Sequence, residues 1–156
     1  MISYRKAVIL LAEDDPGDQE LTRRALALDV GAADLRIVGD GAEALDYIFR
    51  RGRYSDAHAA PQPDLILLDL NMPRVNGRQV LEQLKSQPLA DKIPKVILTT
   101  SCHEDDILRC YALGCNSFIS KPADMNAFLN VIKELRHYWF ELVELPTGLG
   151  RAVSAN

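Results

Sequence analysis

The sequence predicts an α/β fold, a doubly wound five-stranded parallel sheet with helices on both faces. Short apolar segments rich in β-forming residues alternate five times with segments whose apolar residues have helical spacing. The strongest short segments are apolar at every position, which is typical of strands buried on both faces. A chain of 156 residues, 47% of them hydrophobic, suffices for one compact domain and leaves little room for a second.

The elements follow one another in a regular order. Strands are predicted over residues 8–11, 35–38, 65–68, 95–99 and 117–119, the second being more polar and therefore nearer an edge of the sheet. Helical spacing follows Pro16, then recurs at 44–49, 79–84 and 107–112. Pro88 stops the third helix, and Asp124 is suited to cap a long last one. Glycine and prolines in 50–63 predict a loop.

Composition excludes several classes of protein. Eighteen Lys and Arg against 22 Asp and Glu give a net charge of −4, which argues against a nucleic-acid-binding protein. The longest apolar run, 7–12, is far below the roughly 20 residues that span a membrane, and the first residues carry no secretory signal, so a cytoplasmic location is expected. Three cysteines without a CxxC motif predict free thiols rather than disulfides or a zinc site: Cys102, Cys110 and Cys115.

Acidic residues follow two of the predicted buried strands. Glu13 and Asp14 end the first strand and Asp69 ends the third. Ligands of doubly wound sheets gather at the carboxyl ends of the strands, where these carboxylates would repel one another unless a cation lies between them. Because the donors are all oxygens, Mg²⁺ is the expected ion, with Mn²⁺ or Ca²⁺ as substitutes. For Asp15, the favoured role is to cap the following helix.

Asp69 is placed to act as a nucleophile, since the preceding apolar strand anchors its backbone. A carboxylate that attacks a phosphoryl group forms an acyl phosphate, and the reaction requires a metal ion and a positive group. Lys121, after the fifth strand, is suited to supply that charge. Thr100 and the backbone N–H of Ser101, after the fourth strand, are suited to hydrogen-bond the transferred group.

At these residues the chain resembles the receiver domains of two-component response regulators, over about residues 7 to 136. The resemblance lies in the segments LLAEDD at 10–15, LLDLNMP at 67–73 with Gly77, LTTS at 98–101 and FISKP at 118–122. It implies the flavodoxin-like strand order 2-1-3-4-5 and a phosphoacceptor signalling protein rather than an enzyme. It also implies that Asp69 accepts a phosphoryl group from the phosphohistidine of a sensor histidine kinase.

The resemblance assigns further roles. Asp14, Asp69 and the backbone carbonyl of Asn71 would bind Mg²⁺, with Glu13 assisting through water. Lys121 would pair with the carboxylate or phosphate, and its bond to Pro122 would be cis.

The same resemblance implies a switch. Thr100 would move to bond the phosphoryl oxygens, and Phe118 would turn inward to fill the space it leaves. Phe118 stands where receivers often have tyrosine, so any version of the switch that uses a hydroxyl is excluded. The surface that changes would be formed by the helix near 107–112, strand 117–119 and the last helix.

The end of the chain is unusually aromatic, with three consecutive aromatic residues at 138–140 and further apolar residues to 146. Three neighbouring positions point in different directions around a helix, so some must face away from the sheet. Either the loop 53–62 folds over them or they form a dimer or partner surface, and we favour the surface. The segment resembles stand-alone response regulators of bacterial phytochrome-type kinases, which implies a homodimer through the last helix and its extension. We expect one domain over 1–146 and a flexible tail over 147–156.

Three alternatives stay open. A phosphatase of the haloacid-dehalogenase type uses a similar aspartyl nucleophile with Mg²⁺, but it needs an acid/base Asp where this chain has Asn71. A flavodoxin-like FMN carrier would need a Ser/Thr/Gly-rich phosphate loop after the first strand, where Glu13 and Asp14 stand. A receiver-like scaffold that is never phosphorylated is the third, because a fold alone does not establish an activity.

Overall fold

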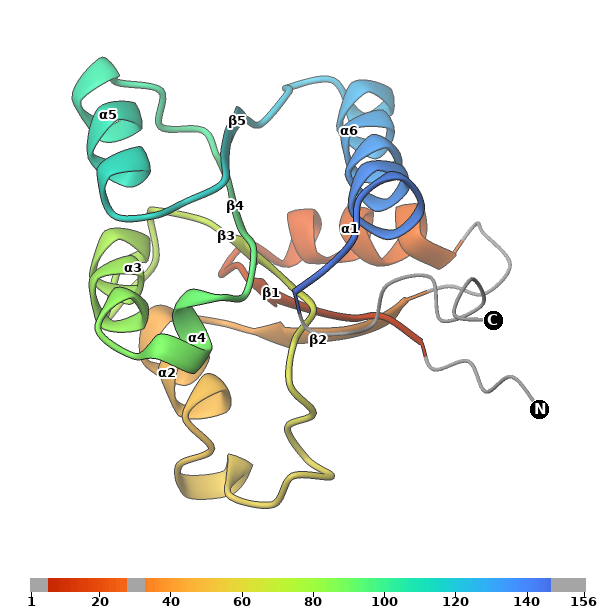
Figure 1. Cartoon of the computed structure of the whole chain (residues 1–156). Helices are drawn as coiled ribbons and strands as arrows, with labels where there is room; N and C mark the ends of the chain where they lie inside the picture. The colour runs from red at the N-terminus through yellow and green to blue at the C-terminus, as the bar shows by residue number, and fades with distance from the viewer. Residues whose placement is uncertain (1–5, 28–32, 147–156) are drawn as a thin grey trace.

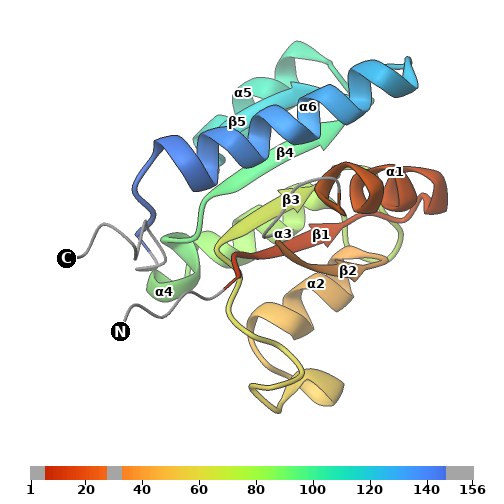
Figure 2. The same ribbon diagram turned by 90° about the vertical axis from the view of Figure 1, so that its right-hand side faces the viewer.

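Five parallel strands form one sheet with helices on both faces, as the sequence predicts. The structure is a computed structural model and describes residues 6–27 and 33–146. The strand order is β2-β1-β3-β4-β5, with every neighbouring pair parallel. Helices α1 and α6 cover one face and α2 to α5 lie over the other (Figures 1 and 2). No helix among the described residues is long and apolar enough to span a membrane.

The elements have the following bounds. The strands are β1 Val8–Ala12, β2 Asp34–Val38, β3 Leu65–Leu68, β4 Lys95–Thr99 and β5 Ser117–Ser120. The helices are α1 Pro16–Ala27, α2 Gly41–Ile48, α3 Gly77–Lys85, α4 Pro88–Asp91, α5 Glu104–Ala112 and α6 Met125–His137. A 3₁₀ turn, Gly52–Tyr54, follows α2, and a π-helical segment, Tyr138–Leu142, extends α6.

The central strands β1 and β3 are apolar throughout, and β4 is apolar between Lys95 and Thr99, because alternate side chains enter two separate cores. Ile9 and Leu11 of β1 pack with residues of α1 and α6, whereas Leu10 and Ala12 pack with residues of α2 and α3. Strands β1, β3 and β4 are buried at every position. Side chains that are to meet a ligand therefore have to stand at or beyond the strand ends, at an edge of the sheet.

Backbone hydrogen bonds continue past the strand ends and fix that edge. The Asp69 N–H donates to the Ala12 carbonyl at 3.1 Å, and the Glu13 N–H donates to the Val38 carbonyl at 3.0 Å. The Lys121 N–H donates to the Thr99 carbonyl at 2.8 Å. The first residue after β1, β3 and β5 thus continues the hydrogen bonding of the sheet.

Helix α3 begins earlier than its apolar spacing predicts, at Gly77 rather than Gln79. Asn76 and Gln79 form a capping box, in which each side chain accepts the other residue's backbone N–H. The cap therefore sets the start, two residues before the apolar face becomes visible in the sequence.

Pro88 does not simply end α3, because it opens the short helix α4, which the sequence analysis missed. Proline is favoured at the first position of a helix, where a backbone N–H has no partner in any case. Lys95 secures the other end, since its buried Nζ donates to the carbonyls of Asp91 at 2.9 Å and Ile93 at 2.8 Å.

The expected cis bond between Lys121 and Pro122 is wrong for this structure. The described residues contain no cis peptide bond. Trans is intrinsically favoured even before proline, and the Lys121 side chain reaches its carboxylate partners with the trans bond in place.

The loop before β3 does not cover the aromatic end of the chain. Tyr54 packs on Tyr47 of α2, with ring centroids 5.1 Å apart, in the core on the α2 side of the sheet. Trp139 and Phe140 pack on the opposite core, with α1 and α6. Of the two interpretations of the aromatic segment, covering by this loop is therefore excluded. The predicted tail, residues 147–156, lies outside the described residues.

The cysteines are free thiols, as predicted: Cys110 and Cys115 are buried and Cys102 is exposed.

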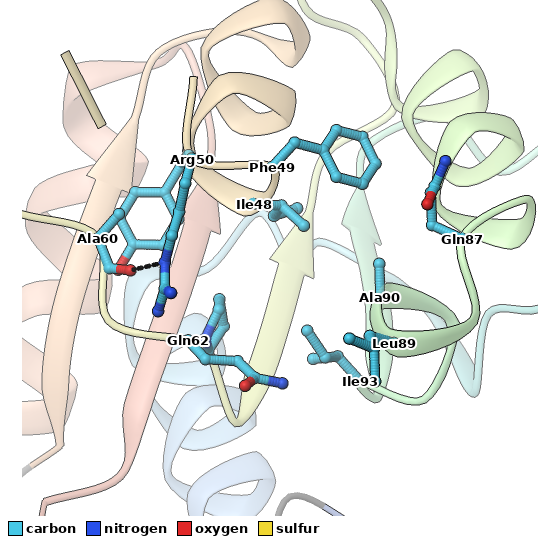
Figure 3. A pocket seen from close by; sticks show the side chains of 11 residues that line it. Ile48, Phe49, Arg50, Ala60, Gln62, Gln87, Leu89, Ala90 and Ile93 are labelled. Carbon is cyan, nitrogen blue, oxygen red and sulfur yellow. Dashed lines mark hydrogen bonds between the residues drawn. The ribbon is translucent and has the colours of Figure 1, made fainter. Parts of the chain in front are cut away.

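A cavity of about 260 Å³ lies between the end of α2, the segment before β3 and α4 (Figure 3). Arg50 closes part of its rim by donating from Nε to the Ala60 carbonyl at 3.2 Å. Because these segments precede β3 and β4, the cavity lies at the amino-terminal edge of the sheet. It is therefore separate from the edge where the acidic residues gather.

Replacing Gly77 with alanine should destabilise the fold. An added Cβ would lie 2.8 Å from the Leu70 Cα and still closer to the Asp69 carbonyl, both of which are backbone atoms. We expect a loss of about 1–3 kcal/mol in the free energy of unfolding, measured by urea titration. The control is Gly17→Ala, at an exposed position of α1. There an added Cβ would lie 3.4 Å from Asp15 Oδ2, an ordinary contact, and the change should be neutral or slightly stabilising. Equal midpoints for the two variants would contradict this account.

Candidate functional site

Four carboxylates and one lysine gather at the carboxyl edge of the sheet. Glu13 follows β1 and Asp69 follows β3, and both are buried, with 3% and 6% of their surface exposed. Asp14 is exposed beside Glu13, and Asp18 comes from the first turn of α1. Lys121 reaches in from the end of β5 with only 5% of its side chain exposed. The structure thus brings together the predicted Glu13, Asp14, Asp69 and Lys121.

Lys121 uses its ammonium group to bind three carboxylates at once. Its Nζ donates to Glu13 Oε1 at 2.5 Å, to Asp18 Oδ2 at 2.8 Å and to Asp69 Oδ2 at 3.0 Å. An ammonium group has three N–H donors, so these bonds account for all of them.

Asp18 is the residue that the sequence analysis missed. It lies three residues after the cap of α1, beyond the run of acidic residues that ends β1. The sequence does contain a signal for Asp18. It is an acidic residue in the first turn of the helix that follows β1, and that turn faces the carboxyl edge of the sheet.

The site carries more negative charge than one lysine can neutralise. The pKa of Glu13 is raised to about 7, because burial and the nearby Asp69 carboxylate raise it more than the hydrogen bond from Lys121 lowers it. Burial also disfavours the charged form of Lys121, but its hydrogen bonds to Asp18 and Glu13 outweigh this effect and raise its pKa. The ammonium group therefore stays protonated, and the carboxylates retain an excess of negative charge.

The acidic residues fit a divalent cation. Glu13, Asp14 and Asp69 each offer one carboxylate oxygen, and these oxygens lie within 4.8 Å of one another. Hard oxygen donors without nearby histidine or cysteine suit Mg²⁺ and similar ions. Asn71, expected to contribute its carbonyl, lies beside the group, and its N–H donates to Asp69 Oδ1 at 3.2 Å. A cation bound here would reduce the repulsion that raises the Glu13 pKa.

Asp15 has the role expected of it. Its Oδ2 accepts the Asp18 N–H at 3.0 Å, as an N-terminal cap of α1 does.

Residues after β4 lie at the same edge. Thr100 is exposed and Ser101 is half-buried. The Ser101 N–H donates to Thr99 Oγ1 at 3.3 Å, and its hydroxyl donates to Asp106 Oδ2 at 2.8 Å. Asp106 also pairs with Arg78 of α3, at 2.7 Å. The Ser101 N–H, predicted to bond a transferred group, thus has a partner within its own loop in this structure.

Phe118 of β5 is half-buried and packs against the core on the α2 side. Its N–H donates to the hydroxyl of Tyr111 at 3.2 Å, which connects β5 with α5. The role of Phe118 in a switch stays a prediction.

The chemistry of the arrangement follows from these contacts. Asp69 presents a carboxylate that is anchored by the sheet, next to a permanently charged ammonium and beside a group of oxygens suited to a cation. Two positive groups around a nucleophilic carboxylate are what the transfer of a phosphoryl group requires.

Comparison with known proteins agrees with this geometry. Response regulator Rcp1 of Synechocystis is 37% identical over 139 residues, which cover 89% of this chain and 92% of that protein. The crystal structure of the phosphorylated cyanobacterial phytochrome response regulator RcpA superposes with a TM-score of 0.87 at 39% identity, covering 91% of this chain and 99% of that one. The Mn²⁺-bound form of Rcp1 gives a TM-score of 0.83 at 36% identity, covering 90% and 99%.

The match to a family covers most of the chain. Residues 9–133 match the response regulator receiver domain, from the second residue of β1 into α6. The match therefore contains all four strand ends that form the site. This chain belongs to the response regulator receiver domain family of two-component signalling.

Proposed function

We propose that this chain is a single-domain response regulator whose Asp69 accepts a phosphoryl group from a sensor histidine kinase. The observation that carries the proposal is the position of the Asp69 carboxylate, between Lys121 Nζ and the oxygens of Glu13 and Asp14. An Asp69 oxygen attacks phosphorus, the bond from phosphorus to the kinase's histidine nitrogen breaks, and that nitrogen keeps the electron pair. The product is an acyl phosphate on Asp69.

We assign the cation to Glu13, Asp14 and Asp69, together with the carbonyl of Asn71. The spacing of the three carboxylate oxygens supports this assignment, and so does the Mn²⁺-bound form of the similar Rcp1. Bound Mg²⁺ supplies positive charge that neutralises the carboxylates and the phosphoryl oxygens. Lys121 holds the Asp69 oxygen in place and brings a positive charge next to the incoming phosphoryl oxygens.

The output of the proposed protein is a change of surface rather than catalysis of a substrate's reaction. In this account Thr100 and the Ser101 N–H bind the phosphoryl oxygens, and Phe118 moves into the space that Thr100 leaves. The bond from Phe118 to Tyr111 and the network of Ser101 with Asp106 support a link from the site to β5 and α5. The phosphoryl group then favours one arrangement of the α5, β5 and α6 face over another.

A phosphatase is the weaker candidate because the chain lacks its proton donor. Asn71 stands two residues after Asp69, and an amide cannot protonate a leaving group as a carboxylic acid does. Repeated hydrolysis of p-nitrophenyl phosphate would favour the phosphatase. A folded, Mg²⁺-binding protein that never takes a phosphoryl group would favour the scaffold.

A phytochrome-type histidine kinase is the partner we propose, and the names of the similar RcpA and Rcp1 proteins support this assignment. The exchange would take place in the cytoplasm, without nucleic acid or membrane. Residues 1–146 would form the whole receiver, with 147–156 as its tail.

We further propose a homodimer through α6 and its π-helical extension. Tyr138 and Leu142 are exposed there, by 49% and 57% of their surface. A second copy on this face would cover these apolar side chains.

The variant Asp69→Asn should take no phosphoryl group, because an amide is not a nucleophile for phosphorus. The measurement is intact-protein mass spectrometry after incubation with Mg²⁺ and acetyl phosphate. Asp46→Asn, which removes a half-exposed carboxylate of α2, is the control and should gain one phosphoryl group like the unmodified chain. Equal phosphorylation of Asp69→Asn would overturn the assignment of the nucleophile.

Asp14→Asn should weaken Mg²⁺ binding by about tenfold or more, since it removes a charged ligand from the group. It should also reduce the Mg²⁺-dependent rise of the melting temperature that binding to the folded state causes. Calorimetric titration and thermal unfolding with and without EDTA measure both effects. Glu20→Gln, on the exposed side of α1, is the control that should bind Mg²⁺ normally. Unchanged affinity in Asp14→Asn would exclude this site.

Leu142→Glu should dissociate the proposed dimer, because a charge placed in an apolar interface loses its hydration. Light scattering after size-exclusion chromatography measures the mass. Leu89→Glu, at a leucine of α4 that is more exposed than Leu142, is the control and should leave the mass unchanged. A monomeric unmodified chain, both with and without phosphate, would disprove the dimer.

A further inference from the structure

Lys121 has one partner that stands outside the acidic group suited to a cation. Glu13 and Asp69 belong to the three residues whose oxygens lie within 4.8 Å of one another, and Asp18 does not. Yet Asp18 Oδ2 accepts from Lys121 Nζ at 2.8 Å, a shorter bond than the one to Asp69 at 3.0 Å. Asp18 is thus the one acceptor of this ammonium group whose oxygens are not needed elsewhere in the site.

The backbone of Asp18 is held rigidly in the first turn of α1. Its N–H donates to Asp15 Oδ2 at 3.0 Å, and its carbonyl accepts from the buried Thr22 hydroxyl at 2.9 Å. The next residue, Gln19, donates from Nε2 to the Glu13 carbonyl at 2.7 Å and so ties this turn to the end of β1. A carboxylate on such a turn offers a fixed direction for a hydrogen bond.

A long lysine side chain needs such a fixed partner. Its four methylene groups give it many rotamers, and ordering it costs conformational entropy. When Glu13 and Asp69 share their charge with a cation and a phosphoryl group, their hold on Lys121 weakens. Asp18 is then the acceptor that keeps the ammonium group directed at the reacting oxygens.

We propose that Asp18 is a positioning residue, which holds the Lys121 ammonium group in place while Asp69 is phosphorylated. This inference rests on the proposed phosphoacceptor function. It predicts that Asp18 acts through Lys121 and not through Mg²⁺, which separates its effect from that of the cation ligands.

The test compares Asp18→Asn with Asp15→Asn at saturating Mg²⁺. Both changes remove one negative charge from the same turn, and asparagine can still cap a helix at residue 15. Because a hydrogen bond between charged groups contributes more than a neutral one, Asp18→Asn should be phosphorylated by acetyl phosphate about tenfold more slowly than Asp15→Asn. The Mg²⁺ dissociation constants of the two variants should agree within about threefold. If the unmodified chain is phosphorylated and the two variants are phosphorylated at equal rates, the role of Asp18 is refuted and the proposed phosphoacceptor function is not.

A second measurement needs no phosphate. The shifts of the melting temperature caused by Asp18→Asn and Lys121→Met should be non-additive in the double variant, as for residues in direct contact. Additive shifts would also refute the inference while leaving the proposed function intact. An unmodified chain that takes no phosphoryl group would overturn both proposals together.

Discussion

The structure depends on one constraint, which is that a strand buried on both faces leaves none of its side chains in water. In β1, β3 and β4 every residue is buried, and the two polar side chains among them, Lys95 and Thr99, are satisfied by hydrogen bonds with the backbone. Chemistry is therefore confined to the first residues after each strand, where the backbone is still held by the sheet. Backbone hydrogen bonds to neighbouring strands fix the positions of Glu13, Asp69 and Lys121. Groups far apart in the sequence meet with little freedom to move.

The fixed backbone positions at the sheet's edge hold two negatively charged side chains close together. Glu13 and Asp69 are buried side by side, and burial raises the Glu13 pKa to about 7. Lys121 offsets part of the repulsion, yet its one positive charge faces several negative ones. The site consequently has an excess of negative charge, and a bound cation would reduce the repulsion between its carboxylates. Groups of this kind are costly for stability and are kept where binding needs them.

The sequence predicts the sheet and most of the site because both rest on local signals. Continuous apolar runs mark the buried strands, and the residue after each run lies at the sheet's edge, which locates Glu13 and Asp69. The signals fail where a contact between distant segments decides the outcome. The capping box at Asn76 and the buried Lys95 beneath α4 set boundaries that apolar spacing does not reveal. The sequence analysis missed Asp18 for the same reason, since its carboxylate bonds Lys121, which lies 103 residues further along the chain.

The three bonds of Lys121 also bear on which side chains this position can accept. Its acceptors are the residues that follow β1 and β3 and a residue in the first turn of α1, so one nitrogen bonds three carboxylates from three segments of the chain. A tetrahedral ammonium group matches such a surrounding, whereas the guanidinium of arginine is flat and directs its donors within one plane. Arginine would carry the same charge to the site and still fail to address all three carboxylates. The shape of the donor, and not its charge alone, thus distinguishes the two basic residues here.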